Sequence, residues 1–288
     1  MAYSDLIPIL DRFLEAAANA GKWRALTPAF RTHAPAVGKV FAAQGAALMK
    51  RAGGKAKEGG MLLPGVGLYA PLREALSVKG WETAWDGVAV QTQDELATVV
   101  QGLAVAGLEA GTAAIGKQFA VGTAFNLKNP RAVAYLREHG AAMVANINDA
   151  TKARIRELVA QGAQEGLSYT EVANTIATEF AGFAKTSAVD VLLDKSQWSR
   201  AERVAITELG QGYESGNLAV GADLAAAGLE MQKSWLTVGD NLVDTDICAA
   251  NQAQGWIAFA DAFQSGHMSP LGHPVCRCTL LMRRKPRG

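Results

Sequence analysis

The apolar positions in the first part of the chain recur at intervals of three and four residues, which is the spacing of a helix face. Residues 4–20 follow this pattern, with Ser4 as the expected cap. We expect a second helix after Pro35 and a third over residues 90–118, where alanine and glycine would let helices approach closely. Between these two, residues 53–60 contain four glycines and three charges, which predicts a flexible loop or hinge. The pattern therefore predicts a helical bundle.

Helix-end signals mark the middle of the chain. Asn129-Pro130 predicts a cap followed by proline in the first turn, and the helical pattern that follows ends near Gly162–Gly166. Ser168-Tyr169-Thr170-Glu171 fits a capping box, in which the serine and glutamate side chains each satisfy an exposed N–H group. After a polar linker over residues 185–197, Ser199 is the expected cap of another helix.

The spacing then changes to two, which is typical of a strand. Met231, Lys233 and Trp235 alternate with polar neighbours, and residues 256–259 and 279–282 are candidates for two further short strands. The chain is therefore expected to be mainly α, with an elongated helical N-terminal half and a small α+β C-terminal domain.

Composition narrows the function classes. The chain has 288 residues, of which 49% are hydrophobic and only 7% aromatic, and its formal net charge is +1. A net charge this close to zero argues against a protein whose whole surface attracts nucleic acid or membrane electrostatically. We see no apolar run of transmembrane length and no signal-peptide pattern. Three cysteines, an odd number, do not suggest a secreted disulfide framework, so we expect assembly in a reducing cytoplasm.

All three cysteines lie in the last fifth of the chain and form, with a histidine, the sharpest candidate site. Three thiolates and one imidazole are a normal complement for structural zinc. The candidate ligands are Cys248, His273, Cys276 and Cys278. One alternative is that Cys276 and Cys278 lie on a strand that sends them to opposite faces, where they cannot share an ion. A second is a disulfide from Cys248 to one of them, formed only after the protein leaves the cell.

Four other side chains of this region have simpler interpretations. His267 is a weaker ligand candidate, because its Ser-Gly-His-Met-Ser loop is expected to be exposed. Lys233 is expected to be a partly exposed strand residue. Trp235 and Trp256 are expected to anchor the core of the small end domain.

The order of motifs over residues 125–282 resembles the phage Mu F-like family of minor head (head morphogenesis) proteins. Phe125-Asn126-Leu127 and the helices after it resemble the middle of these proteins. The motifs that follow are Ala205-Ile206-Thr207-Glu208, Lys233-x-Trp235, Asp244-x-Asp246-Ile247-Cys248 and His273-Pro274-Val275-Cys276-Arg277-Cys278. The chain departs from the family pattern twice. Ile206 stands where an arginine is usual, and Asn251 stands where many relatives carry a second cysteine.

The resemblance implies a division of the chain and a role. It implies a helical middle region over 125–198 and a Mu F-like α+β domain over 199–288. Residues 1–124 are expected to be a variable helical region, and its Ala and Leu faces could pack on partner helices, so we expect this region to dock on portal or capsid. The implied protein is a non-catalytic virion component. It would associate with the portal and capsid proteins and with packaged DNA, and not with a membrane, and it would assist head assembly and DNA packaging or delivery.

Two other function classes stay open. Asp240, Asp244 and Asp246 could serve as acid–base groups or metal ligands, although acidic residues in a turn are more often solvated turn formers. Thr207-Glu208 could indicate a phage-borne, toxin-like ADP-ribosyltransferase domain, and the missing arginine argues against it.

The last class is a DNA-binding scaffold. A short basic run is sufficient for phosphate contact, although a solvated terminus is the simpler interpretation. The run consists of Arg283, Arg284, Lys285 and Arg287.

Overall fold

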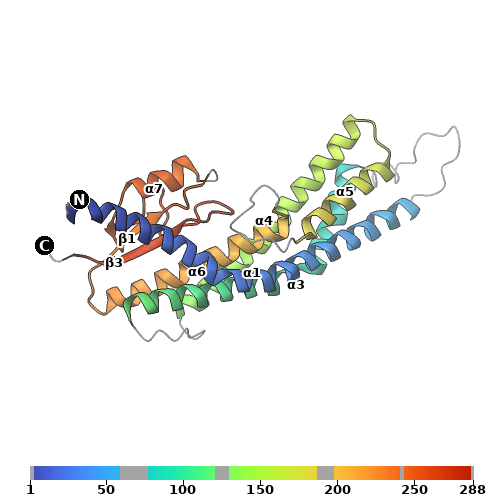
Figure 1. Cartoon of the computed structure of the whole chain (residues 1–288). Coiled ribbons are helices and arrows are strands. Elements are labelled where there is room, and N and C mark those ends of the chain that lie inside the picture. Colours follow the sequence, from blue (N-terminus) through green and yellow to red (C-terminus); the bar gives the residue numbers. More distant parts are fainter. Residues whose placement is uncertain (1–2, 59–76, 121–129, 187–197, 241–242, 287–288) are drawn as a thin grey trace.

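The computed structural model of the chain describes residues 3–58, 77–120, 130–186, 198–240 and 243–286, and Figure 1 shows an elongated helical body with a small sheet at one end. The predicted fold class, mainly α with a small α+β C-terminal part, is confirmed. The helices of the body are α1 (Tyr3–Glu58), α3 (Val78–Phe119), α4 (Pro130–Gln164), α5 (Tyr169–Ala184) and α6 (Arg200–Ala226). The end with the sheet contains β1 (Met231–Leu236), the π-helical turn η1 (Thr245–Ala249), α7 (Ala250–Ala253), β2 (Ile257–Ala258) and β3 (Thr279–Arg284).

Helix α1 runs without interruption through Pro28 and Pro35 to Glu58, so the predicted start after Pro35 and the predicted break at Gly53 are wrong. Each internal proline costs a helix about 3 kcal/mol. Burial of one large apolar side chain returns about 1.5–3 kcal/mol, and several are buried on one face of α1. These side chains are Trp23, Leu26, Phe30, Val37, Phe41 and Leu48. Tertiary burial therefore outweighs the helix-breaking residues, and Gly59-Gly60 lies outside the described residues.

Helices α3 and α6 pack at very close range through glycines. A Cβ atom at Gly107 or Gly111 of α3 would overlap the backbone of α6, and one at Gly212 or Gly216 of α6 would overlap the backbone of α3. The predicted close approach of small-residue helices is thus confirmed for α3, which begins earlier than predicted.

Helix α3 also contains an 18-residue window that is long and apolar enough to cross a membrane, with a mean hydropathy of 1.4. Half of that window is buried inside the fold, where α3 packs against α1, α4 and α6. This burial is typical of a helix in the core of a fold.

The predicted helix ends in the second half of the body are confirmed. Ser168 and Glu171 form a capping box at the start of α5, and Ser199 forms a second one with Glu202 at the start of α6. Gly166 adopts a positive φ of 70° in the turn between α4 and α5, which is the left-handed conformation that glycine favours. Most of the predicted linker over 185–197 lies outside the described residues.

The sheet has the order β2-β1-β3, with both pairings antiparallel. Trp235 pairs with Leu280 in register and is buried, so its predicted role as a core anchor is confirmed. Trp256 is only half-buried, which contradicts the same prediction for it. Its ring instead carries the Arg283 guanidinium 4.1 Å from its centroid.

Lys233 is wholly buried, so the prediction of a partly exposed strand residue is wrong. Its Nζ donates to the Met268 carbonyl oxygen at 2.9 Å and lies 5.6 and 5.3 Å from the ring centroids of Phe259 and Phe263. Burial lowers the pKa of Lys233 to about 8, with the nearby Asp261 carboxylate opposing the shift.

Candidate metal centre

The π-helical turn η1 presents Cys248 to the interior of the sheet end. Asp244 caps this turn, because its Oδ1 accepts hydrogen bonds from the backbone N–H groups of Asp246 and Ile247 at 2.9 and 2.7 Å. Cys248 follows one turn later and is completely buried. The motif residue Asp244 therefore acts as a cap that orients the cysteine.

A tight turn over His273–Cys276 supplies the other two side chains of the centre. The Cys276 backbone N–H donates to the His273 carbonyl at 3.2 Å, and Val275 between them has a positive φ of 58°. Such a conformation is strained for a β-branched residue. Thr207 of α6 stabilises it, since its Oγ1 accepts from the Val275 N–H at 3.0 Å. Thr207 thus has a structural role in the site.

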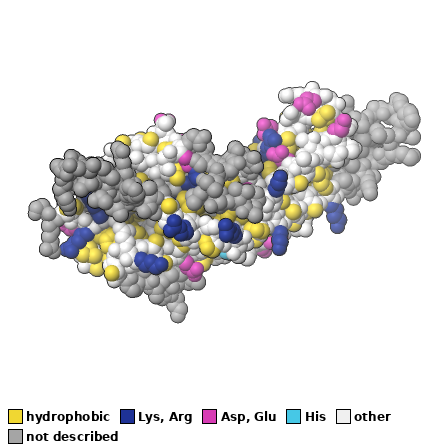
Figure 2. Space-filling model, in the orientation of Figure 1, with side chains coloured by type: hydrophobic (Ala, Val, Ile, Leu, Met, Phe, Trp, Pro, Cys, Tyr) yellow, Lys and Arg dark blue, Asp and Glu magenta, His cyan; other side chains and the backbone are white. Residues whose placement is uncertain are grey.

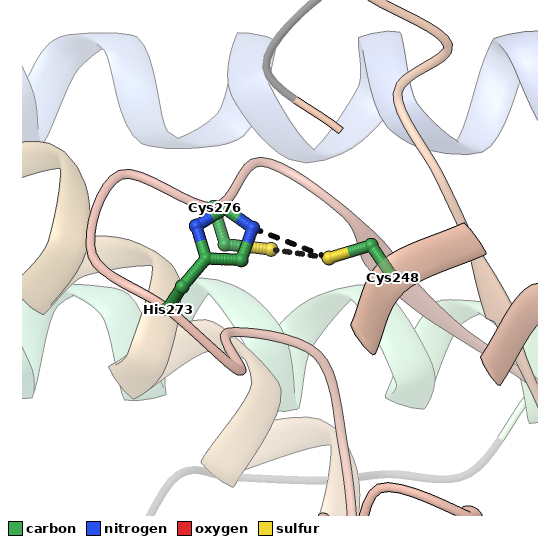
Figure 3. A group of neighbouring side chains, drawn as sticks. All are labelled: Cys248, His273 and Cys276. Atoms are coloured by element: carbon green, nitrogen blue, oxygen red, sulfur yellow. Dashed lines mark hydrogen bonds between the residues drawn. The ribbon is translucent and has the colours of Figure 1, made fainter. Parts of the chain in front are cut away.

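The three side chains converge, as Figure 3 shows. The Cys248 Sγ lies 3.3 Å from His273 Nε2 and 3.6 Å from Cys276 Sγ, and the three potential ligand atoms lie within 4.8 Å of one another. Tetrahedral zinc, with Zn–S near ~2.3 Å and Zn–N near ~2.05 Å, separates two sulfurs by about 3.8 Å and sulfur from nitrogen by about 3.6 Å. The two spacings from Cys248 Sγ are therefore close to those of a zinc-ligand set.

The protonation pattern also suits a metal. His273 Nδ1 lies 3.0 Å from the Pro274 carbonyl oxygen, which requires a proton on Nδ1, and Nε2 is the ring nitrogen that faces the thiols. Hydrogen bonds from Cys248, Cys278 and His273 hold the pKa of Cys276 well below its usual range. The contact with Cys276 in turn raises the pKa of His273 to about 9. One thiolate is thus already favoured, and a cation would replace the protons shared around it.

Cys278, the fourth predicted ligand, is buried next to the other three but outside their compact group. Its thiol interacts with those of Cys248 and Cys276. The alternative in which a strand separates Cys276 from Cys278 is wrong. Both residues precede β3, and side chains two residues apart in an extended chain share a face. All three thiols are free, so the structure contains no disulfide between them.

The acidic residues of this region do not gather into a second site. Asp240 forms an ion pair with the buried Arg277, Asp244 caps η1, and Asp246 is exposed in its first turn. Among the residues that the structure describes, the only group of three or more potential metal ligands is Cys248, His273 and Cys276. His267, predicted to be exposed, is half-buried, and its Nδ1 lies 2.9 Å from Ser265 Oγ.

A buried ion pair, which the sequence analysis did not predict, connects α1 to the segment that contains Cys276 and Cys278. Lys22 Nζ of α1 donates to Glu214 Oε1 of α6 and to the Cys278 carbonyl oxygen, at 2.7 Å each. The neighbouring Trp23 Nε1 donates to the Arg277 carbonyl at 3.3 Å. We call Lys22 and Glu214 the clamp. The sequence signal for it is a single lysine within the apolar stripe of α1.

Glu214 is almost completely buried, and burial raises its pKa while the Lys22 ammonium opposes the shift. Three more groups donate hydrogen bonds to its carboxylate. They are Asn217 Nδ2, Thr279 Oγ1 and the Leu280 N–H. The clamp therefore joins α1, α6 and the start of β3 in one network.

The second residue of the Thr207-Glu208 motif lies away from the cysteines. Glu208 is buried, and its Oε2 lies 2.8 Å from Nε2 of His139 on α4. Ile206, at the position where the resemblance led us to expect an arginine, is fully buried in the core between α1, α3 and α6. A charged side chain at that position would have no solvent to reach.

The basic tail is partly engaged within the chain. Arg283 donates to Gln232 Oε1 at 2.9 Å while stacking on Trp256, and Lys285 lies 3.4 Å from a Glu230 carboxylate oxygen. Arg284 is exposed, and Arg287 lies outside the described residues.

Comparison with known proteins finds a family for one part of the chain. Residues 153–281 match the model of the family described as "Phage Mu protein F like protein". This part of the chain, from the second half of α4 into β3, is therefore a Mu F-like domain, and the expected resemblance is confirmed over that range. The match indicates a phage head morphogenesis protein, a structural class associated with the virion. No curated protein and no solved structure matches the chain.

Proposed function

We propose that this is a minor head protein that associates with the portal and the interior of the capsid and assists head assembly and DNA packaging or delivery. The observation that supports the proposal is the Mu F-like match over residues 153–281. A non-catalytic role agrees with the engagement of Thr207 and Asp244 in backbone contacts that shape the fold.

We propose further that the Cys248–His273–Cys276 centre holds a structural Zn²⁺, with Cys278 completing the set. The segment between β1 and β3 has little regular secondary structure, and a bound metal would stabilise its turns. Zinc fits because thiolate and imidazole are the ligands that it favours in structural sites. Cys278 would complete the set because its thiol already interacts with those of Cys248 and Cys276.

Metal analysis of the full-length protein under reducing conditions tests the zinc proposal. We expect one zinc per chain, with loss in Cys248→Ser and Cys276→Ser. The Cys278→Ser variant tests whether the zinc has three protein ligands or four. If Cys278 is the fourth ligand, this variant should weaken zinc retention in a chelator competition by at least tenfold. Zinc well below one per chain in the unsubstituted protein would refute the site.

Co-purification tests the head role. Tagged full-length protein, expressed with the cognate portal, should elute with the portal ring and should be present in purified heads. Its absence from both would overturn the proposal. Helices α1 and α3 form the core together with α6, so deletion of the N-terminal half would remove the packing of the Mu F-like domain itself. Point variants are therefore needed to locate the surface that contacts the portal.

A further inference from the structure

The solvent-facing side of α1 carries a line of cations that have no side-chain partner among the described residues. Exposed residues recur along it at intervals of three or four, which places them on one face of the helix. In order they are Arg24, Pro28, Arg31, Pro35, Lys39, Ala42, Ala46 and Lys50. We call Arg24, Arg31, Lys39 and Lys50 the basic stripe. Lys and Arg side chains recur along the length of the molecular face in Figure 2.

The segment of α1 that carries the basic stripe has no acidic residue of its own. The sequence contains no aspartate or glutamate between Glu15 and Glu58. Within the described part of the chain, no side chain forms a hydrogen bond or ion pair with a cation of the basic stripe. Among the described residues, therefore, no acidic group competes with an external anion for these four charges.

Helix α4 provides the contrast. Three cations in its second half are paired, the half-buried Lys152 with Asp86 at 2.8 Å, the half-buried Arg154 with Glu179 at 2.7 Å, and the exposed Arg156 with Glu82. The outer face of this part of α4 thus pairs its cations with carboxylates, and the basic stripe differs from it.

The spacing indicates an extended polyanion. With a rise of ~1.5 Å per residue, successive cations of the stripe lie roughly 10, 12 and 16 Å apart along about 39 Å of helix. At these separations, no two cations of the stripe can contact the same phosphate group. Double-stranded DNA, in contrast, presents a charge about every 1.7 Å of its axis when both strands are counted, so its phosphates form an array that extends over the length of the stripe.

The residues between the cations favour DNA over other extended anions. They are alanine and proline, which let a phosphate backbone approach the helix closely. Protein interfaces are enriched in aromatic residues, Met and Arg, and membrane-surface helices expose Trp, Phe or Leu. The stripe carries no large apolar side chain.

We propose that the exposed face of α1 is a sequence-independent binding surface for the phosphate backbone of double-stranded DNA, with Arg24, Arg31, Lys39 and Lys50 as the contacts. The surface lies outside the Mu F-like domain and is independent of the metal centre. It would hold the protein against DNA through charge alone, so binding depends strongly on salt.

The test is fluorescence anisotropy of a labelled 30-base-pair duplex with full-length protein over about 50–200 mM salt. Four neutralised phosphates give a slope of log K against log salt near −3.6, or about a hundredfold loss of affinity over this range. R24Q/R31Q/K39Q should reduce the magnitude of the slope by about 2.7. The matched control, K152Q/R154Q/R156Q, removes the same charge from paired positions and should retain the slope. Circular dichroism verifies that both variants are folded.

An unchanged slope in the α1 variant, or an equal loss in the α4 control, would refute the inference. The variant R284Q/K285Q removes two charges of the C-terminal tail and so tests whether the tail, and not the basic stripe, binds the duplex. Loss of binding in that variant alone would also refute the inference. So would binding to anionic phospholipid vesicles without binding to the duplex. None of these results bears on co-purification with the portal, so the head role stands or fails separately.

Discussion

Replacing Lys22 by methionine removes the positive member of the clamp and keeps most of the side-chain volume. The Lys22 Nζ has no exposed surface, and its two oxygen partners lie 2.7 Å away. In Lys22→Met, the Glu214 carboxylate stays buried with hydrogen-bond donors but without its cation. Loss of one partner of a buried ion pair costs about 3–5 kcal/mol, which lowers Tm by about 10 °C in a protein of this size.

Urea unfolding followed by circular dichroism measures this cost. Lys22→Met/Glu214→Gln should recover part of it, because the unpaired charge is then absent. Lys152→Met is the matched control, since the side chains of Lys152 and Asp86 are 30% and 57% exposed and such pairs contribute about 1 kcal/mol or less.

The pH dependence gives a second readout. In Lys22→Met, the pKa of Glu214 in the folded state rises further above its unfolded value. A raised carboxyl pKa contributes stability at low pH that is lost as pH rises through the folded pKa. The deficit of the variant should therefore grow between pH 5 and pH 8. A cost below about 1 kcal/mol, or one equal to that of Lys152→Met, would refute the assignment of the clamp.

Three further predictions concern packing, a buried charge and the metal. Gly111→Ala should destabilise by about 1–3 kcal/mol in urea unfolding, because its Cβ overlaps the Tyr213 backbone, whereas Gly21→Ala, with open space, should not. Lys233 has a folded pKa near 8, below its unfolded value, so its burial costs most below pH 8 and progressively less toward pH 10. Lys233→Met should therefore gain stability relative to the unsubstituted protein at pH 7, by up to about 3 kcal/mol, and lose that advantage at pH 10. Zinc should dissociate as pH falls from 7 to 5 because protons compete for the thiolates and His273, which a chromogenic chelator detects.

Several features follow from local sequence alone. Both capping boxes use residues three apart, so their geometry is complete once the first helical turn forms. Strand β1 follows from alternation, and the ligands His273 and Cys276 lie within one turn. Such signals need only neighbouring residues, and the structure agrees with them.

Other features depend on residues far apart in the chain. Helix α1 continues through Pro28 and Pro35 because its apolar stripe is buried by α3, α5 and α6, which propensity cannot show. Lys22 meets Glu214 across 192 positions, and neither residue has a local signal for the other. Lys233 is buried because β1 is the central strand and the Met268 loop covers its end.

The candidate metal centre likewise has features that the local sequence predicts and features that only the tertiary structure determines. The residue types and the short spacing from His273 to Cys278 are present in the sequence and predict zinc chemistry. Whether Cys248, 25 residues before His273, joins them depends on the Asp244-capped turn and on the Thr207 contact that fixes Val275. Local hydrogen bonds determine the ends of helices, and only the burial of distant surfaces against one another determines which side chains meet.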